Sequence, residues 1–398
     1  MSKTSSRWLR LLIALIAVCV LVASSLYGMI PPAQAQTIVT TINVGQRPDA
    51  IAVNHLTNRI YVGSYGSQDI TVINGDSNTV ATTFPYGAPV QAIEINPRTN
   101  RLYASNYSTT TVLSPDTGAV LGRIDQSLSH DSELAINTQT NRLYLCDWAV
   151  VGGQADHLHI YDGNTNALIK TIGFATSIYY QKLAVAVNEA TNMVYVAYSY
   201  NDRTYFIDGA SNAIVNTISV GVPDSDLDIA VDSQTNRVYV KGAANVTVLD
   251  GSSGARVGQI PGEWDIEVNS AANRVYLFRS KTFQILDGST LGVLYSMQLP
   301  YTITGGGINA ATNRVYLLHE YNDKLTIVQD DLLHPSTMTA TRTRIPTFTR
   351  TTTRTPASTA TPTLTPSPTA TRTPTATPFP TPIGGWPASV FLPVMLMD

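Results

Sequence analysis

Cysteine is nearly absent from the sequence. The chain of 398 residues has two cysteines, and Cys19 lies inside an N-terminal apolar run that we expect to be removed. The remaining Cys146 has no partner for an internal disulfide, so the folded part of the chain must depend on packing. We expect Cys146 to be a small buried apolar side chain rather than a reactive thiol.

Common catalytic and membrane motifs are missing as well. The sequence holds no G-x-S-x-G, no H-E-x-x-H and no glycine-rich phosphate loop. The apolar run, residues 11–23, is shorter than the ~20 residues that a membrane span needs. No segment keeps the 3.6-residue period of a long amphipathic helix. These absences argue against the familiar catalytic constellations and against a helical fold.

The two ends of the chain differ in composition from the middle. Three basic residues precede the apolar run, and an A-x-A pattern at Ala33 and Ala35 follows it, which predicts a Sec-type signal peptide over residues 1–35. Residues 334–383 are rich in Thr, Pro and Ser and predict a disordered linker. Residues 384–398 are apolar but too short to span a bilayer, and we interpret them as a sorting or docking tag. We therefore expect a secreted or cell-surface monomer without a transmembrane segment in its mature form.

Charge is distributed unevenly. The formal net charge is −3, but three basic residues lie at the N-terminus and five arginines lie in the C-terminal tail. Between them 17 basic residues stand against 27 acidic ones, so the middle of the chain carries about ten net negative charges. This acidic excess argues against nucleic acid as a partner.

A short phrase of the form Asn-Arg-aliphatic-Tyr recurs seven times. The steps between its asparagines are 42, 41, 51, 44, 37 and 40 residues, which indicates a repeat architecture. Its residues are Asn58, Arg59, Tyr61; Asn100, Arg101, Tyr103; Asn141, Arg142, Tyr144; Asn192, Tyr195; Asn236, Arg237, Tyr239; Asn273, Arg274, Tyr276; and Asn313, Arg314, Tyr316. In the fourth copy Met193 replaces the arginine.

Each repeat contains four short segments rich in β-branched and aromatic residues, separated by Asn, Asp, Gly and Ser. In the first copy they cover residues 50–54, 59–64, 70–74 and 79–84. Four strands per unit of about 42 residues predict an all-β, seven-bladed β-propeller of four-stranded blades over residues 36–333. The seventh copy ends after its third strand, and residues 37–45 resemble a fourth strand. We therefore expect the N-terminal strand to close the ring.

The repeat resembles the YVTN β-propeller repeat of exported and cell-surface proteins. The defining Tyr-Val pair is present at residues 61–62, 195–196 and 239–240, with Leu or Ala after Tyr in the other copies. The resemblance implies the seven-bladed fold over residues 37–331. Propellers of this type carry many unrelated activities, so it implies no particular function.

The repeated residues fit structural roles. We expect the tyrosine rings to pack between blades, with hydroxyls reaching polar partners, and the arginine heads to lie at the rim. Four copies place Asp-Gly in the turn after the third strand, where we expect glycine to supply a positive φ and aspartate to pair with the arginines. The asparagines should adopt left-handed conformations. The functional alternative, an arginine ring that binds nucleic acid, stays open as a weaker reading.

The residues that the repeats do not share are the better functional candidates. Aligned first strands carry small residues toward the axis, but Glu94, Glu267, Glu133, Asp228 and Asp265 depart from this rule and predict an acidic central channel. Lys182 and Arg47 are candidate partners for these carboxylates. Aromatic residues are expected on the same face, so the ligand-binding candidates are Trp148, Tyr179, Tyr180, Trp264, Glu133, Asp228 and Asp265.

These patterns favour a binding module for a carbohydrate, peptide or protein ligand, with no catalytic residue and no cofactor. The rival is a lactonase-like hydrolase or lyase whose divalent cation is held by Glu133, Asp228 and Asp265. His157 and His159 share one face of a strand, which is how a metal site can begin. Without a third ligand we interpret them as structural, and we predict no metal site there.

Overall fold

The structure is a computed structural model, and it describes residues 36–125, 133–147, 155–176, 182–220 and 227–331. The expected signal peptide (1–35), linker (334–383) and C-terminal segment (384–398) lie outside these residues. No helix in the described ranges combines the length and apolar character that a membrane span needs.

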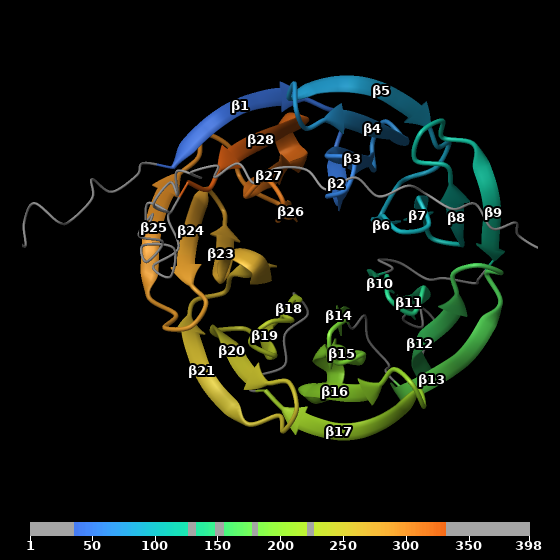
Figure 1. The fold of residues 1–398 in the computed structure, drawn as a ribbon, viewed down its shortest axis with the longest axis vertical. Coiled ribbons are helices and arrows are strands. Elements are labelled where there is room, and N and C mark those ends of the chain that lie inside the picture. The colour runs from blue at the N-terminus through green and yellow to red at the C-terminus, as the bar shows by residue number, and fades with distance from the viewer. Residues whose placement is uncertain (1–35, 126–132, 148–154, 177–181, 221–226, 332–398) are drawn as a thin grey trace, which may run out of the picture. The chain divides into compact units, whose positions relative to one another are not determined.

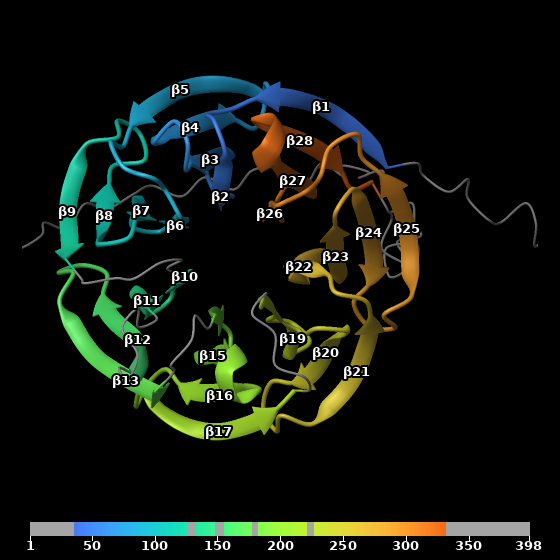
Figure 2. The ribbon, with the colours of Figure 1, turned by 180° about the vertical axis from the view of Figure 1, so that it is seen from behind.

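The described residues form seven antiparallel four-stranded sheets arranged in a ring (Figures 1 and 2), which confirms the predicted propeller. Blade 1 is β2 (Pro48–Asn54), β3 (Arg59–Ser64), β4 (Asp69–Asn74) and β5 (Thr79–Pro85). Blade 2 is β6 (Ala92–Asn96), β7 (Arg101–Ser105), β8 (Thr109–Leu113) and β9 (Val120–Asp125). Blade 3 is β10 (Glu133–Asn137), β11 (Arg142–Asp147), β12 (Ala155–Asp162) and β13 (Leu168–Thr176).

The remaining blades repeat this order from the axis outward. Blade 4 is β14 (Leu183–Asn188), β15 (Met193–Tyr198), β16 (Arg203–Asp208) and β17 (Ala213–Ser219). Blade 5 is β18 (Ile229–Asp232), β19 (Arg237–Lys241), β20 (Asn245–Asp250) and β21 (Arg256–Pro261). Blade 6 is β22 (Asp265–Asn269), β23 (Arg274–Arg279), β24 (Thr282–Asp287) and β25 (Val293–Gln298). Single 3-10 turns occur at η1 (Ser199–Asn201), η2 (Ser270–Ala272) and η3 (Glu320–Asn322).

Blade 7 joins the two ends of the described chain. It consists of β26 (Gly305–Asn309), β27 (Arg314–His319), β28 (Lys324–Gln329) and the N-terminal β1 (Thr37–Asn43). In Figure 1 the blue β1 lies along the outside of the orange β28, and the two pair antiparallel with Thr41 opposite Thr326. The predicted closure by the N-terminal strand is therefore confirmed.

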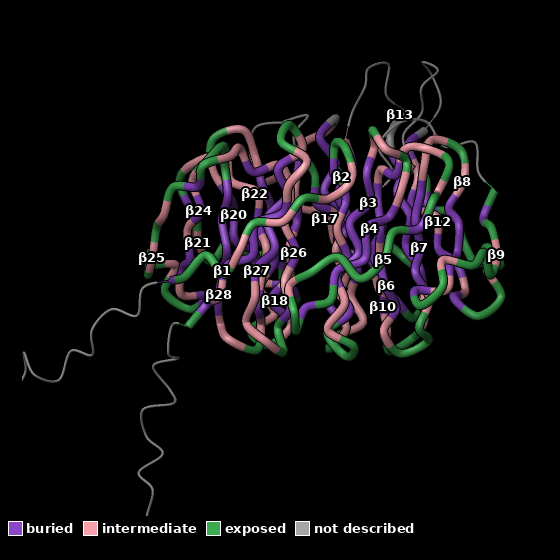
Figure 3. Tube along the Cα trace, turned by 90° about the horizontal axis from the view of Figure 1, so that it is seen from above, coloured by how far each residue is buried: buried purple, intermediate pink, exposed green. Residues whose placement is uncertain are grey.

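Apolar packing between neighbouring blades forms the core. The second and third strands are buried on nearly every residue because blades cover both of their faces, whereas the outer strands are largely exposed (Figure 3). Seven buried clusters each span one boundary between blades. Each contains one repeated tyrosine of the preceding blade, as Tyr103 packs on Leu143 and Leu145. This confirms the expected place of the tyrosine rings.

The repeated asparagine has a left-handed backbone in all seven copies, with φ between 50° and 55°, as expected. In five of these copies it also receives a hydrogen bond from an asparagine side chain of the preceding blade. The Asn96 side chain accepts the backbone N–H groups of Arg98 and Thr99 through its oxygen, and it donates to Asn141 Oδ1 at 2.7 Å. Four further boundaries have the same donor and acceptor: Asn137 to Asn192, Asn188 to Asn236, Asn269 to Asn313, and Asn309 to Asn58.

The expected pairing of the arginines with aspartates is only partly correct. Arg59 reaches Asp116 of the next blade at 3.0 Å, and Arg274 is buried with Asp287 and Asp330 each 3.9 Å away. Four others donate instead to a glycine carbonyl in the next blade: Arg101 to Gly163, Arg142 to Gly209, Arg237 to Gly288, and Arg314 to Gly75. In three of these turns the side chain of Asp162, Asp208 or Asp287 accepts backbone N–H groups of its own turn, and in the fourth Asn74 does the same.

The expected positive φ at the Asp-Gly glycines is wrong. In blade 3 the left-handed residue of this turn is Asn166, with φ 58°, while Gly163 has an ordinary φ. Glycine is needed there for close approach, because a Cβ on Gly163 would lie 2.4 Å from Asn141 Oδ1. Asp162 Oδ1 accepts the N–H groups of the two residues after the glycine, each at 2.9 Å.

We expect Gly163→Ala to destabilise the protein by about 1–3 kcal/mol, because the new methyl group must displace the Asn141 side chain that joins blades 2 and 3. Denaturant unfolding of the purified protein measures the change. The matched control is Gly292→Ala, since a Cβ there would meet only the Thr290 hydroxyl at 3.4 Å. Equal stability of the two variants would contradict the close-approach argument.

Candidate functional site

The first strands of the blades surround an axial channel, and its mouth lies where these strands begin. The mouth is a cavity of about 340 Å³. Its polar lining residues are Asp49, Gln91, Glu133, Lys182, Asp228, Asp265, Glu267 and Thr304. We call this cavity the channel mouth. A second cavity of about 540 Å³ continues toward the opposite side and shares Glu133, Asp228 and Glu267 with it.

The structure brings together three of the predicted site residues and separates a fourth. Glu133, Asp228 and Asp265 all line the channel mouth, as does Lys182. Trp264 is not among the residues that line either cavity. Its indole nitrogen donates to the Pro261 carbonyl at 2.8 Å, and its ring packs against the apolar cluster between blades 5 and 6. Trp148, Tyr179 and Tyr180 lie outside the described residues.

Asp228 is held by backbone groups of two blades. Its Oδ1 accepts the N–H of Ile229 at 2.8 Å, and its Oδ2 accepts the N–H of Ile266, in the next blade, at 2.7 Å. Burial, together with the neighbouring Asp265 carboxylate, raises the pKa of Asp228 to about 6. The side chain is thus fixed in place and close to its protonation midpoint near neutral pH.

Asp265 has a partner that the sequence interpretation missed. The buried Lys241 donates to Asp265 Oδ1 at 2.6 Å. Arg47, one of the two candidate partners named from the sequence, instead pairs with Glu320 at 2.9 Å and lies over the Tyr65 ring. Lys241 is the last residue of β19, at a position where the second strands of several other blades have an apolar or small residue. This departure from the repeat could have identified Lys241 from the sequence.

Two further carboxylates of the channel, Glu94 and Glu267, have raised pKa values. Burial raises the pKa of Glu94 to about 8, with Glu133 adding to the shift. Burial also raises the pKa of Glu267 well above its ordinary value, with Asp228 and Glu94 adding to it. The channel therefore carries less negative charge at neutral pH than its composition suggests.

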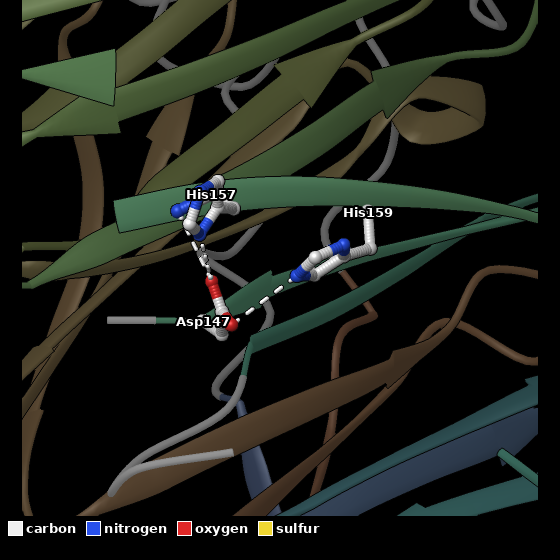
Figure 4. Close-up of side chains that lie close together, drawn as sticks. All are labelled: Asp147, His157 and His159. Carbon is white, nitrogen blue, oxygen red and sulfur yellow. Dashed lines mark hydrogen bonds and ion pairs between the residues drawn. The ribbon is translucent and has the colours of Figure 1, made fainter. Parts of the chain in front are cut away.

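The expected metal ligands do not form a metal-binding group. Among the described residues, one set of three potential ligands has its ligand atoms within 4.8 Å of one another, and it is Asp147, His157 and His159 (Figure 4). Glu133, Asp228 and Asp265 are not such a set. The third potential ligand that the two histidines lacked in the sequence is Asp147, at the end of the neighbouring strand.

Comparison with known proteins supports the fold and nothing more specific. No family model matches the chain, and no curated protein matches it by sequence. Among solved structures, Raptor of Chaetomium thermophilum superposes with a TM-score of 0.63 at 9% identity over 75% of this chain and 29% of that chain. The β-propeller domain of Cps50 (Swd1) of Myceliophteria thermophila superposes with a TM-score of 0.60 at 8% identity, covering 74% of this chain and 100% of that one.

The chain is thus a seven-bladed β-propeller whose fold is similar to that of WD40 propellers. It spans less than a third of the length of Raptor. At these identities the likeness concerns the fold alone. Propellers commonly serve as scaffolds for protein interaction.

We expect Glu94→Gln to stabilise the protein at pH 8 by about 1–2 kcal/mol. The folded-state pKa of Glu94 lies above its ordinary value of 4.5, so the folded protein keeps a proton that the unfolded chain releases. This contribution to stability is present below about pH 4.5 and is lost as the pH rises toward 8. Glutamine removes the loss, so the gain in Tm should grow over that interval.

The control for this experiment is Glu263→Gln, because Glu263 is a half-exposed carboxylate paired with Arg279 at 2.7 Å. Its effect should stay within about 0.5 kcal/mol and change little with pH. A Tm gain of Glu94→Gln that is the same at acidic and alkaline pH would show that folding does not raise the pKa of Glu94.

Proposed function

We propose that the chain is an exported, surface-displayed propeller of the YVTN-repeat type that acts as a non-enzymatic binding module. Its ligand is a peptide or protein that inserts a basic group into the channel mouth. The export is inferred from residues 1–35 and the display from the Thr/Pro-rich segment, both on sequence grounds.

The composition of the channel mouth carries this proposal. Five carboxylates and one lysine line a cavity of about 340 Å³, which lies within the range of pockets that take small ligands or single side chains. Burial raises the pKa of two of these carboxylates, Asp228 and Glu267, so the negative charge at neutral pH is smaller than their number. Negative groups gathered in a concave, poorly solvated site focus their field on a cation. A lysine or arginine side chain of a partner matches both the size and the sign of this cavity.

Trp264, the one aromatic candidate within the described residues, does not favour a carbohydrate in the same way. Sugar sites usually offer an aromatic face beside hydrogen-bonding groups. Trp264 is engaged with its own connection and does not line the mouth. The acidic lining therefore supports a basic peptide ahead of a sugar.

Two rivals receive less support. A metal-assisted hydrolase or lyase needs Glu133, Asp228 and Asp265 to converge, and in the described part of the chain their oxygens do not form a group within 4.8 Å. Nucleic-acid binding needs arginine heads that are available to phosphates. The heads of Arg101, Arg142 and Arg237 are instead directed at carbonyls of the next blade.

Binding of immobilised basic, acidic and neutral peptides to the secreted chain tests the proposal. We expect retention of lysine- or arginine-rich peptides, weakened by salt, with Glu133→Gln lowering the affinity about fivefold. Asp76→Asn is the control, because Asp76 is exposed in a turn on the opposite side of the ring. Equal retention of acidic and basic peptides, or equal losses in the two variants, would refute the proposed ligand class.

A further inference from the structure

A cluster of two histidines and one aspartate lies on blade 3, apart from the channel mouth. Asp147 is the last residue of β11 and pairs directly with His157 of β12. His159 lies two residues further along β12, so its side chain is on the same face of the sheet as that of His157. Figure 4 shows both imidazoles directed at the Asp147 carboxylate.

The distances in this cluster suit a small metal ion. His157 Nδ1 lies 3.4 Å from Asp147 Oδ1, and His159 Nε2 lies 3.2 Å from Asp147 Oδ2. A tetrahedral Zn²⁺ with bonds of about 2.0–2.1 Å separates its ligand atoms by about 3.3 Å. One ligand atom from each residue already lies within 4.8 Å of the others, so small side-chain rotations would complete the site.

Neighbouring groups orient these ligands. Thr171, opposite His159 on β13, lies with its hydroxyl 2.9 Å from His159 Nδ1. When Nδ1 donates to that hydroxyl, the lone pair of Nε2 faces the carboxylate, an arrangement that a cation between them stabilises. The His157 backbone N–H donates to Asp147 Oδ1 at 3.1 Å and holds the carboxylate in position.

The repeat does not account for these residues. The position of His159 is threonine in four other blades: Thr71, Thr111, Thr247 and Thr326. The residue opposite His157 on β13 is Gly173, which leaves space beside the imidazole. The His157 side chain is 34% exposed and that of Asp147 16%, so an ion can reach the cluster from solvent.

We propose that Asp147, His157 and His159 bind a divalent transition-metal ion, with Zn²⁺ as the best match. Two imidazoles and one carboxylate are the donors of mononuclear zinc sites, whereas Ca²⁺ and Mg²⁺ prefer sites built from oxygen alone. The three residues fill three positions of a tetrahedral ion. The fourth position is open to water or to a group of a ligand.

Zinc titration of tag-free, chelator-treated protein tests the site. We expect one Zn²⁺ ion per chain, a rise in Tm on adding zinc, and visible absorption bands of a low-coordinate ion with Co²⁺. His159→Gln and Asp147→Asn should each lower the zinc affinity at least tenfold. Thr171→Val keeps all three ligands and should lower it less, which provides a test even if a ligand variant folds poorly.

His55→Gln is the matched control, because His55 is exposed at the far end of the channel. It should keep the zinc affinity and the zinc-dependent rise in Tm. Absence of zinc uptake would leave the cluster as a hydrogen-bonded carboxylate and overturn the proposal. Unchanged uptake in folded His159→Gln would assign the zinc to other histidines and overturn it equally. Neither result bears on peptide binding at the channel mouth.

Discussion

A blade of this propeller has two apolar faces, and it can bury both only between two other blades. The ring must therefore close, and β1 achieves this by pairing with β28. The repeated residues of each blade make their contacts with the blade that follows it in the sequence. The Tyr103 ring, the Arg101 head and the Asn96 amide all contact blade 3 from blade 2. The residues of the Asn-Arg-aliphatic-Tyr phrase thus form the contact between neighbouring blades, and the phrase occurs seven times because the ring has seven such contacts.

Features that depend on local pattern could be predicted from the sequence, and those that depend on how blades are placed could not. Strand alternation and the 42-residue step determine the fold, and the left-handed asparagines follow from turn chemistry. The acceptor of an arginine is different, because it depends on which atom of the next blade lies nearest. Gly163 illustrates this: its role comes from Asn141 beside it, not from its own φ. Propensity carries no information about such close approaches.

In the channel, the charge of one residue that departs from the repeat depends on the other departures near it. Small residues at the axis leave room for water, and Glu94 and Glu267 project into that room from opposite blades. Counting carboxylates in the sequence overstates the charge there, because burial and mutual repulsion favour their protonated forms. At the mouth the buried Lys241 lies 2.6 Å from Asp265 and offsets its charge, so a departure on the second strand also changes the channel.

Blade 3 holds several of the residues that depart from the repeat. The register of its strands explains why the channel mouth and the histidine cluster lie on the same rim. Glu133 begins β10 opposite Cys146 on β11, and Asp147 follows directly. The first strand thus delivers a carboxylate to the channel mouth while the second delivers one to the histidine cluster. The step between phrases is also longest here, at 51 residues. A residue added near the end of a strand can place a functional side chain on the rim without disturbing the repeated tyrosine that packs between blades. A repeat fold therefore acquires new sites where its copies are free to differ.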